Sequence, residues 1–283
     1  MEPSYLGKSE LRGNGSESAL IPRKIHYCWF GRNPKPKLAE KCIQSWRKLC
    51  PDYEIIEWNE DNYDLSTAPL YVRQAYEMKK WAFVTDYIRL HVVYEHGGIY
   101  MDTDVELRKP LDSLLNHPAY FGFEDGRNVN TGLGFGAENG LPMLKELMDD
   151  YADIAFQKPD GDYDHTPCPV RNTKIFLRHG LVQNDSYQIL PNGVLILPNM
   201  YLSPIDFETK FKRIMPETIS IHWFSGSWQT EEERSACETY TRKLRKEYYS
   251  EKIKQPIRSL LGEDGFRLLK KLLKRGEEDH ADN

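Results

Sequence analysis

A helix followed at once by two glycines constrains this chain more than any other feature. Residues 81–96 have the pattern of a helix, in which Asp86 and Arg89 stand three positions apart and therefore share one face. Gly97 and Gly98 come next and supply the left-handed backbone at which helices commonly end. The chain is therefore expected to leave the helix abruptly and to enter a different element.

That next element reads as a short apolar strand with two carboxylates at its end. Asp102 and Asp104 stand one residue apart just beyond it. A hard divalent cation such as Mg2+ or Mn2+ prefers acidic oxygens of this kind and can bridge them to phosphate oxygens. Such a cation, next to an Asp/Arg pair able to hydrogen-bond hydroxyls, indicates a nucleotide-sugar site. Read alone, an Asp-x-Asp sequence is a weak signal, because acidic residues are common in surface turns.

Composition sets outer limits on the class of protein. The 283 residues, 40% of them hydrophobic, suffice for one large domain with an appended tail, and the net charge of -5 gives no reason to expect nucleic acid as a partner. Five cysteines without a C-x-x-C pair indicate reduced thiols of a cytoplasmic protein rather than zinc ligands or disulfides. No apolar run approaches the roughly 18 residues that cross a bilayer, and residues 1–20, which lack a secretory-signal pattern, predict a disordered leader.

Strands and helices alternate along the first half of the chain. The expected strands cover residues 24–30 and 53–58, and the expected helices cover residues 36–49, 70–80 and, further along the chain, 141–156. This alternation implies right-handed crossovers and a mostly parallel sheet, which makes an α/β fold. Ligands bind at the carboxyl ends of strands in such sheets, and Trp29 and Asp102 both fall at such ends.

The series of helix, Gly-Gly, strand and DxD resembles the core signature of glycosyltransferase family 32, the enzymes with a sugar-binding region containing a DXD motif. It is more distantly similar to the large clostridial glucosylating toxins. The resemblance implies a GT-A-type nucleotide-sugar-binding fold and a bacterial enzyme of capsular or surface polysaccharide synthesis. We therefore expect a leader over residues 1–20, a GT-A glycosyltransferase domain over 21–230, and a basic, amphipathic helical tail over 231–283.

The resemblance also implies roles for individual residues. Asp86 and Arg89 are expected to hydrogen-bond the donor sugar, and Tyr100 to line its pocket. Asp102 and Asp104 are expected to bind ribose, metal and diphosphate, with Mn2+ or Mg2+ as the cofactor.

Three further segments extend the predicted site. Trp29 lies in residues 25–31, which resemble the opening motif of the family. It is expected to stack on the nucleotide base, although a Trp in an apolar strand is often a core residue. Asn130 starts a Gly-rich segment that is neither a P-loop nor a Rossmann fingerprint. It is a candidate sugar contact, and the alternative is a segment whose glycines let another backbone approach. Residues 219–228 resemble the closing motif of the family. In this segment Ser227 and Trp228 are expected at the donor, and His222 is either a metal or phosphate contact or a buried structural histidine.

The reaction implied by the resemblance retains the anomeric configuration, with a UDP-sugar as the expected donor and a glycan or lipid-linked oligosaccharide as the acceptor. A cation held by Asp102 and Asp104 would stabilise the departing diphosphate. Retention can use a carboxylate nucleophile or attack on the same face as the leaving phosphate. No carboxylate in the sequence clearly fills the nucleophile role, so we favour same-face attack. Asp104→Ala is then expected to abolish turnover, whereas Asp125→Ala leaves a measurable rate.

The end of the chain has a pattern of its own. Residues 252–275 hold eight Lys or Arg and two acidic residues, with an apolar stripe that is broken near residues 262–265. This pattern predicts a helix lying peripherally on an anionic membrane such as the inner face of the plasma membrane. The alternative is a tail packed on the catalytic domain or on a partner subunit.

Two other classes of protein remain open at this stage. A haloacid-dehalogenase-like phosphohydrolase also uses Asp-x-Asp after a strand, but its motif usually lies near the N-terminus, whereas here it begins at Asp102. A non-enzymatic carbohydrate-binding protein would need no metal carboxylates, so its binding would survive the loss of Asp102 and Asp104.

Overall fold

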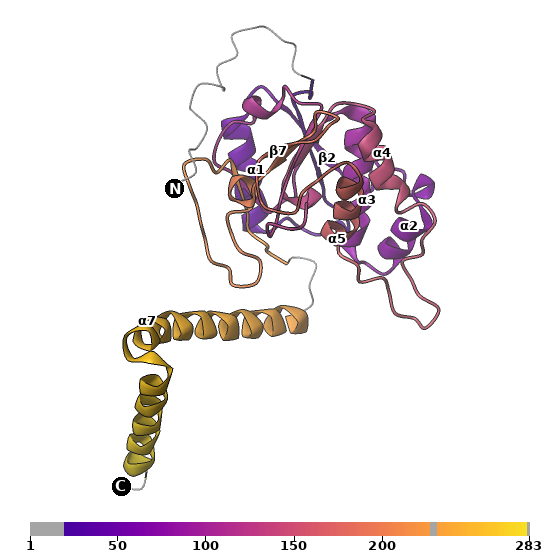
Figure 1. The fold of residues 1–283 in the computed structure, drawn as a ribbon. Helices are drawn as coiled ribbons and strands as arrows, with labels where there is room; N and C mark the ends of the chain where they lie inside the picture. The colour runs from indigo at the N-terminus through magenta and orange to yellow at the C-terminus, as the bar shows by residue number, and fades with distance from the viewer. Residues whose placement is uncertain (1–19, 227–230, 282–283) are drawn as a thin grey trace. The chain divides into compact units, whose positions relative to one another are not determined.

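The computed structural model describes residues 20–226 and 231–281. The chain divides into two compact units. The first holds the described residues up to 226, apart from residues 208–210, and its strands form a layer with helices on both faces (Figure 1). The second consists of the long helix α7 (Glu231–Ala281) together with residues 208–210.

Seven strands of the first unit form the central sheet, in the order β2-β1-β3-β6-β5-β8-β7. They are β1 (Lys24–Cys28), β2 (Glu54–Trp58), β3 (Gly98–Tyr100), β5 (Ala119–Gly122), β6 (Phe135–Ala137), β7 (Gln188–Ile189) and β8 (Leu195–Leu197). All of these strands run in one direction except β6 and β7. A separate antiparallel pair joins β4 (Val105–Leu107) to β9 (Ser220–His222). The predicted α/β class is thus confirmed, with the mostly parallel central sheet expected of a GT-A-type domain.

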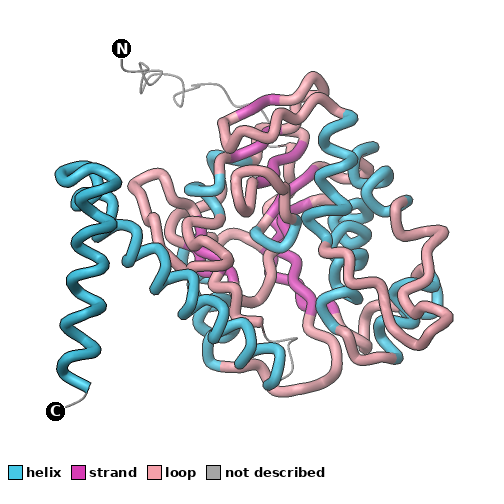
Figure 2. The backbone as a smooth tube through the Cα atoms, turned by 60° about the horizontal axis from the view of Figure 1, so that its bottom comes forward, coloured by secondary structure: helices cyan, strands magenta, loops and turns pink. Residues whose placement is uncertain are grey.

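Helices pack on both faces of this sheet, as Figures 1 and 2 show. On one side lies α1 (Lys37–Leu49), and on the other lie α2 (Leu70–Glu77), α3 (Trp81–His96), α4 (Pro142–Asp149) and α5 (Cys168–Arg178). Short helical turns complete the unit: η1 (Leu65–Thr67), η2 (Asp112–Leu114), η3 (Thr131–Leu133) and α6 (Asn199–Leu202). Each face has its own buried cluster, one containing Trp46 of α1 and the other containing Ile88 of α3.

The predicted turn between helix and strand is confirmed. Helix α3 ends at His96, and its C-cap Gly97 has φ 61° while its amide donates to the carbonyl of Val93 at 2.8 Å. Gly98 has φ 111° and already belongs to β3. A Cβ on Gly98 would lie 2.9 Å from the carbonyl oxygen of Lys24 in the neighbouring strand, so both the backbone angle and the space require glycine.

Three predicted boundaries were wrong. The helix expected over residues 70–80 ends at Glu77. The helix expected over residues 141–156 ends at Asp149, although Tyr151 beyond it is still fully buried. Asp149 and Asp150 both stand at its C-terminal end, where negative charge opposes the helix dipole. The strand expected over residues 24–30 ends at Cys28, so Trp29 directly follows the strand.

The second unit is almost entirely helical. Thr241 and Arg245 of α7 donate hydrogen bonds to the carbonyls of Glu208 and Thr209, at 2.8 and 2.5 Å. The helical backbone is interrupted at Gly262, which has φ 68° and ψ 172° and lies where the apolar stripe of the sequence is broken. None of the helices in the described part of the chain combines the length and the apolar character needed to cross a membrane.

Candidate active site

The candidate site lies where the carboxyl ends of the parallel strands meet. Trp29 follows β1, Asp102 follows β3, and Glu124 follows β5. Asn130 stands before β6, which is antiparallel to its neighbours and therefore starts at this same edge. Ligands of open α/β sheets bind at this edge.

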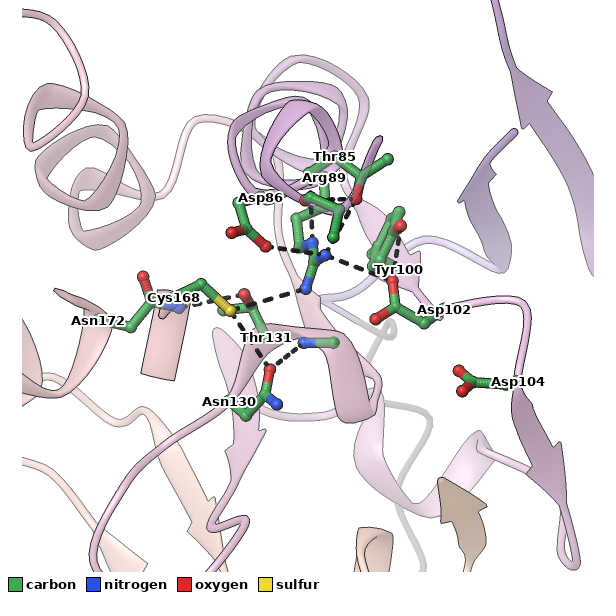
Figure 3. A network of polar contacts seen from close by, with 12 residues as sticks. Thr85, Asp86, Arg89, Tyr100, Asp102, Asp104, Asn130, Thr131, Cys168 and Asn172 are labelled. Carbon is green, nitrogen blue, oxygen red and sulfur yellow. Dashed lines mark hydrogen bonds and ion pairs between the residues drawn. The ribbon is translucent and has the colours of Figure 1, made fainter. Parts of the chain in front are cut away.

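The Asp86/Arg89 pair of helix α3 points into this edge (Figure 3). Arg89 Nη2 lies 3.0 Å from Asp86 Oδ1 and 3.5 Å from Asp102 Oδ1. Arg89 Nε also donates to the backbone carbonyl of Thr85 at 3.0 Å, which fixes the orientation of the guanidinium. The side chains of Arg89 and Asp86 are only 4% and 9% exposed. A buried ion pair on α3 thus lies against the carboxylate of Asp102, which stands just beyond the end of β3.

The pKa values of Asp86 and Asp102 depend on burial and on the Arg89 guanidinium that both carboxylates share. Burial raises the pKa of Asp86 to about 6, although Arg89 opposes that shift. Burial likewise raises the pKa of Asp102 against the opposing effect of Arg89. Two carboxylates therefore share one guanidinium, so that the acceptor oxygens of Asp86 and Asp102 lie beside the donor N–H groups of Arg89. That mixture suits a ligand with several hydroxyl groups, since each hydroxyl both donates and accepts.

Tyr100 lies in β3 beneath this cluster and is almost completely buried. Its hydroxyl donates to Asp102 Oδ1 at 2.9 Å, and its ring centroid lies 5.2 Å from the guanidinium carbon of Arg89. Tyr100 therefore orients Asp102 and supports Arg89 through a cation–π contact. Its predicted role as part of the lining of a sugar pocket stays a prediction.

The Gly-rich segment closes the site from the opposite side. Asn130 Oδ1 accepts a hydrogen bond from the amide of Gly132 at 2.6 Å and faces the thiol of Cys168 at 3.6 Å. The amide nitrogen of Asn130 donates to the carboxylate of Glu124. A Cβ on Gly132 would lie only 2.4 Å from Asp102 Oδ2. Gly132 thus allows the Gly-rich segment to approach the carboxylate of Asp102 closely. The contact between Asn130 and a sugar stays a prediction.

Several residues of the site were not found from the sequence. Cys168 and Asn172 stand four positions apart on α5 and share a face that points toward Arg89 and the Gly-rich segment (Figure 3). Arg89 Nη1 lies 4.0 Å from Cys168 Sγ, and Asn172 Nδ2 donates to Thr131 Oγ1 at 3.1 Å. The i, i+4 spacing of two polar residues on a helix was the available signal, but nothing in the sequence indicated which face would be buried.

The second half of the site is built by the small sheet. The antiparallel pairing of β4 with β9 sets Val105 opposite His222, directly after Asp104. His222 Nε2 lies 3.1 Å from Asp104 Oδ1, and the amide of Ser225 donates to Asp104 Oδ2 at 2.8 Å. One ligand atom each from Asp102, Asp104 and His222 lies within 4.8 Å of the others. Two residues predicted from the DxD motif and one from the closing motif therefore converge.

These three residues fit a divalent cation. Burial favours the neutral form of Asp104, yet His222 and the Ser225 amide hold its pKa well below the usual range. Burial lowers the pKa of His222, but the neighbouring Asp104 carboxylate raises it, and the net shift in the pKa of His222 is upward. Within the described residues, His222 Nδ1 is buried without a hydrogen-bond partner. Two carboxylates and one imidazole suit Mn2+ better than Mg2+, because Mg2+ takes nitrogen ligands poorly.

The remaining predicted donor contacts are only partly described. Trp29 is half-buried, its indole nitrogen donates to the carbonyl of Asn33 at 2.6 Å, and the ammonium of Lys35 lies 5.7 Å from its ring. Its stacking on a nucleotide base stays a prediction. Ser227 and Trp228 lie outside the described residues.

Residues 36–121 match the family described as "Glycosyltransferase sugar-binding region containing DXD motif". The match makes this part of the chain similar to the sugar-binding region of such glycosyltransferases. The family resemblance inferred from the sequence is therefore confirmed. The matched region runs from α1 into β5 and includes Asp86, Arg89, Tyr100, Asp102 and Asp104.

Curated relatives share this region. The chain is 28% identical over 148 residues to "Inositol phosphoceramide mannosyltransferase 3" of Schizosaccharomyces pombe, covering 50% of this chain and 40% of the relative. It is 25% identical over 208 residues to "Subversion of eukaryotic traffic protein A" of Legionella pneumophila, covering 60% of this chain and 32% of the relative. Among solved structures, "PaToxG Glycosyltransferase" matches with 19% identity and a TM-score of 0.44, covering 56% of this chain and 68% of that one. The chain thus spans 40% or less of the length of these two curated relatives.

Proposed function

We propose that this chain is a metal-dependent glycosyltransferase that moves a sugar from a nucleotide-sugar to a glycan or lipid-linked acceptor. The observation that carries the proposal is that Asp102 belongs to two groups of side chains at once. This carboxylate contacts the Asp86/Arg89 pair and also belongs to the cluster with Asp104 and His222. A sugar held by the first group would therefore adjoin a diphosphate held at the second.

Each part of the proposed site has a separate task. Asp102, Asp104 and His222 would hold the cation, which when bound supplies the positive charge that stabilises the departing diphosphate. Arg89 and Asp86 would fix the sugar hydroxyls and so orient the anomeric carbon. The proposed donor contacts are completed by Trp29, Tyr100, Asn130, Ser227 and Trp228. We assign this catalytic domain to residues 21–230 and the tail to residues 231–283.

The proposed reaction retains the anomeric configuration by same-face attack. The acceptor oxygen bonds to the anomeric carbon as the bond from that carbon to the phosphate oxygen breaks, and the leaving phosphate takes the acceptor proton. The product would keep the α configuration of the donor. Nuclear magnetic resonance of the product measures that configuration directly, and a β-linked product would reject this mechanism without rejecting glycosyl transfer.

The names of the relatives suggest which substrates to try first. Several are named as mannosyltransferases, and inositol phosphoceramide appears as the acceptor in the names of three of them. A nucleotide-linked mannose therefore joins the UDP-sugars as a donor to test. We propose a lipid-linked glycan of surface polysaccharide synthesis as the acceptor, with an inositol phospholipid as the comparison substrate.

The tail provides a way to reach such an acceptor. We propose that residues 252–275 bind an anionic membrane surface, because basic charge is combined with apolar side chains that are exposed in α7. Ile253 and Leu260 are 66% and 85% exposed. Sedimentation with anionic vesicles would compare the full chain with a chain ending at Ser250, and neutral vesicles would serve as the control. Equal binding of the two chains would reject the membrane proposal.

Nucleotide release tests the enzyme proposal directly. Purified chain is incubated with UDP- and GDP-sugars in the presence of Mn2+, Mg2+ or EDTA, and Asp102→Ala/Asp104→Ala is run beside Asp125→Ala. Asp125 is exposed and its carboxylate accepts hydrogen bonds only from its own turn among the described contacts, so this variant is the matched control. We expect metal-dependent release that the double variant loses and the control keeps. If no donor is turned over or bound in calorimetry, the proposal fails.

A further inference from the structure

The carboxylate of Glu124 stands at the active-site edge but has no place in the reaction described so far. Glu124 follows β5, whose carboxyl end lies at the same edge as that of β3. In the sheet only β6 separates these two strands, and the Gly-rich segment leads into β6. Glu124 therefore flanks that segment on the side opposite Asp102.

Asn130 ties Glu124 to the candidate sugar site. Asn130 Oδ1 accepts from the amide of Gly132, so its amide nitrogen must face the other way, and there it donates to Glu124 Oε2. Asn130 is buried and neutral. Its hydrogen bond therefore orients the Glu124 carboxylate without cancelling the negative charge.

The electrostatic surroundings agree with this placement. Burial raises the pKa of the Cys168 thiol, and the nearby carboxylates of Asp86 and Glu124 raise it further. Cys168 itself lies 3.6 Å from Asn130 Oδ1 and 4.0 Å from Arg89 Nη1. Glu124 is thus joined through Asn130 and Cys168 to the Asp86/Arg89 pair.

This inference rests on the proposed glycosyltransferase function. We propose that Glu124 is a catalytic residue whose carboxylate faces the sugar ring and stabilises the positive charge that develops at the anomeric carbon. No bond to Glu124 forms, and the acceptor proton still goes to the leaving phosphate. A fixed negative charge acts on the transition state more than on the neutral bound sugar, so it lowers the barrier without tightening donor binding.

The variant Glu124→Gln separates a charge effect from a structural one. Glutamine keeps an oxygen that accepts the hydrogen bond from Asn130, but it removes the charge. We expect kcat to fall about 100-fold or more, while donor KM and the calorimetric Kd for Mn2+ stay within about threefold of the wild-type values. Asp125→Asn removes the same charge one residue later, on an exposed side chain, and is expected to match the wild type.

The outcomes decide the assignment. Turnover by Glu124→Gln within about threefold of the wild type, or a raised donor KM with unchanged kcat, would reduce Glu124 to a positioning residue for Asn130 and overturn the proposal. Glu124→Asp keeps the charge and should retain more activity than Glu124→Gln, and the reverse order would also overturn it. If the wild type itself turns over no donor, the proposed function fails. Wild-type turnover with an active Glu124→Gln would reject only the role of Glu124.

Discussion

The variant Gly132→Ala adds a single methyl group at the point where the Gly-rich segment contacts the carboxylate of Asp102. That Cβ would lie 2.4 Å from Asp102 Oδ2 and 2.9 Å from Arg89 Nη1, whereas ordinary contact begins near 3.4 Å. The Asp102 carboxylate must therefore move by about 1 Å, and a misplacement of that size can lower turnover about 100-fold. Overpacking at a buried position also costs about 1–3 kcal/mol of unfolding free energy.

The assay for Gly132→Ala is steady-state nucleotide release with the best donor, together with Mn2+ titration and a thermal melt. We expect turnover to fall about 100-fold and Mn2+ to bind more weakly in a protein that still folds. Gly140→Ala is the control, because a Cβ there would meet nothing within 4 Å, although its φ of 70° adds some strain. Turnover of Gly132→Ala within about threefold of the wild type would refute the reasoning.

Three further predictions concern pH, metal and the guanidinium. His26 Nδ1 accepts a hydrogen bond from Trp58 Nε1 at 3.1 Å, and its Nε2 donates to the carbonyl of Gly97 at 2.8 Å. These two hydrogen bonds require a neutral imidazole, and burial lowers the pKa of His26 to about 4. The unfolded chain takes up this proton near pH 6.5 and the folded chain only near pH 4, so the unfolding free energy should fall by about 3 kcal/mol across that window as the pH decreases. Urea titrations at several pH values measure this loss, and His26→Gln, which cannot titrate, should lack that component; equal slopes would count against it. His222→Ala should weaken Mn2+ binding at least by the ~10-fold typical of losing an outer-shell partner, and should weaken Mg2+ binding less; calorimetry with the two ions would contradict this if both fell equally. Arg89→Lys loses the fork that reaches Asp86 and Thr85 together, and should lower kcat/KM about 10- to 100-fold, since a hydrogen bond to a charged group contributes about 1.5–3 kcal/mol; near-normal kinetics would show that only the charge matters.

The features that the sequence determined by itself are local ones. The i, i+3 spacing placed Asp86 beside Arg89, and the two glycines required the backbone angles at which α3 stops. The position of Asp102 after a short apolar strand put it at a carboxyl edge. Each of these depends on residues within a few positions of one another, so steric rules and hydrogen-bond spacing decide them before the chain folds.

Only the tertiary structure decided which distant side chains complete the site. His222 reaches Asp104 because β9 pairs with β4, across more than a hundred residues of chain. Cys168 and Glu124 meet Asn130 through α5 and β5, and no periodicity in those segments marks the buried face as functional. Such contacts depend on strand order and helix packing, which are set by the burial of two whole apolar clusters rather than by any short motif. The sequence therefore determined one half of the site, and the sheet topology assembled the other half around it.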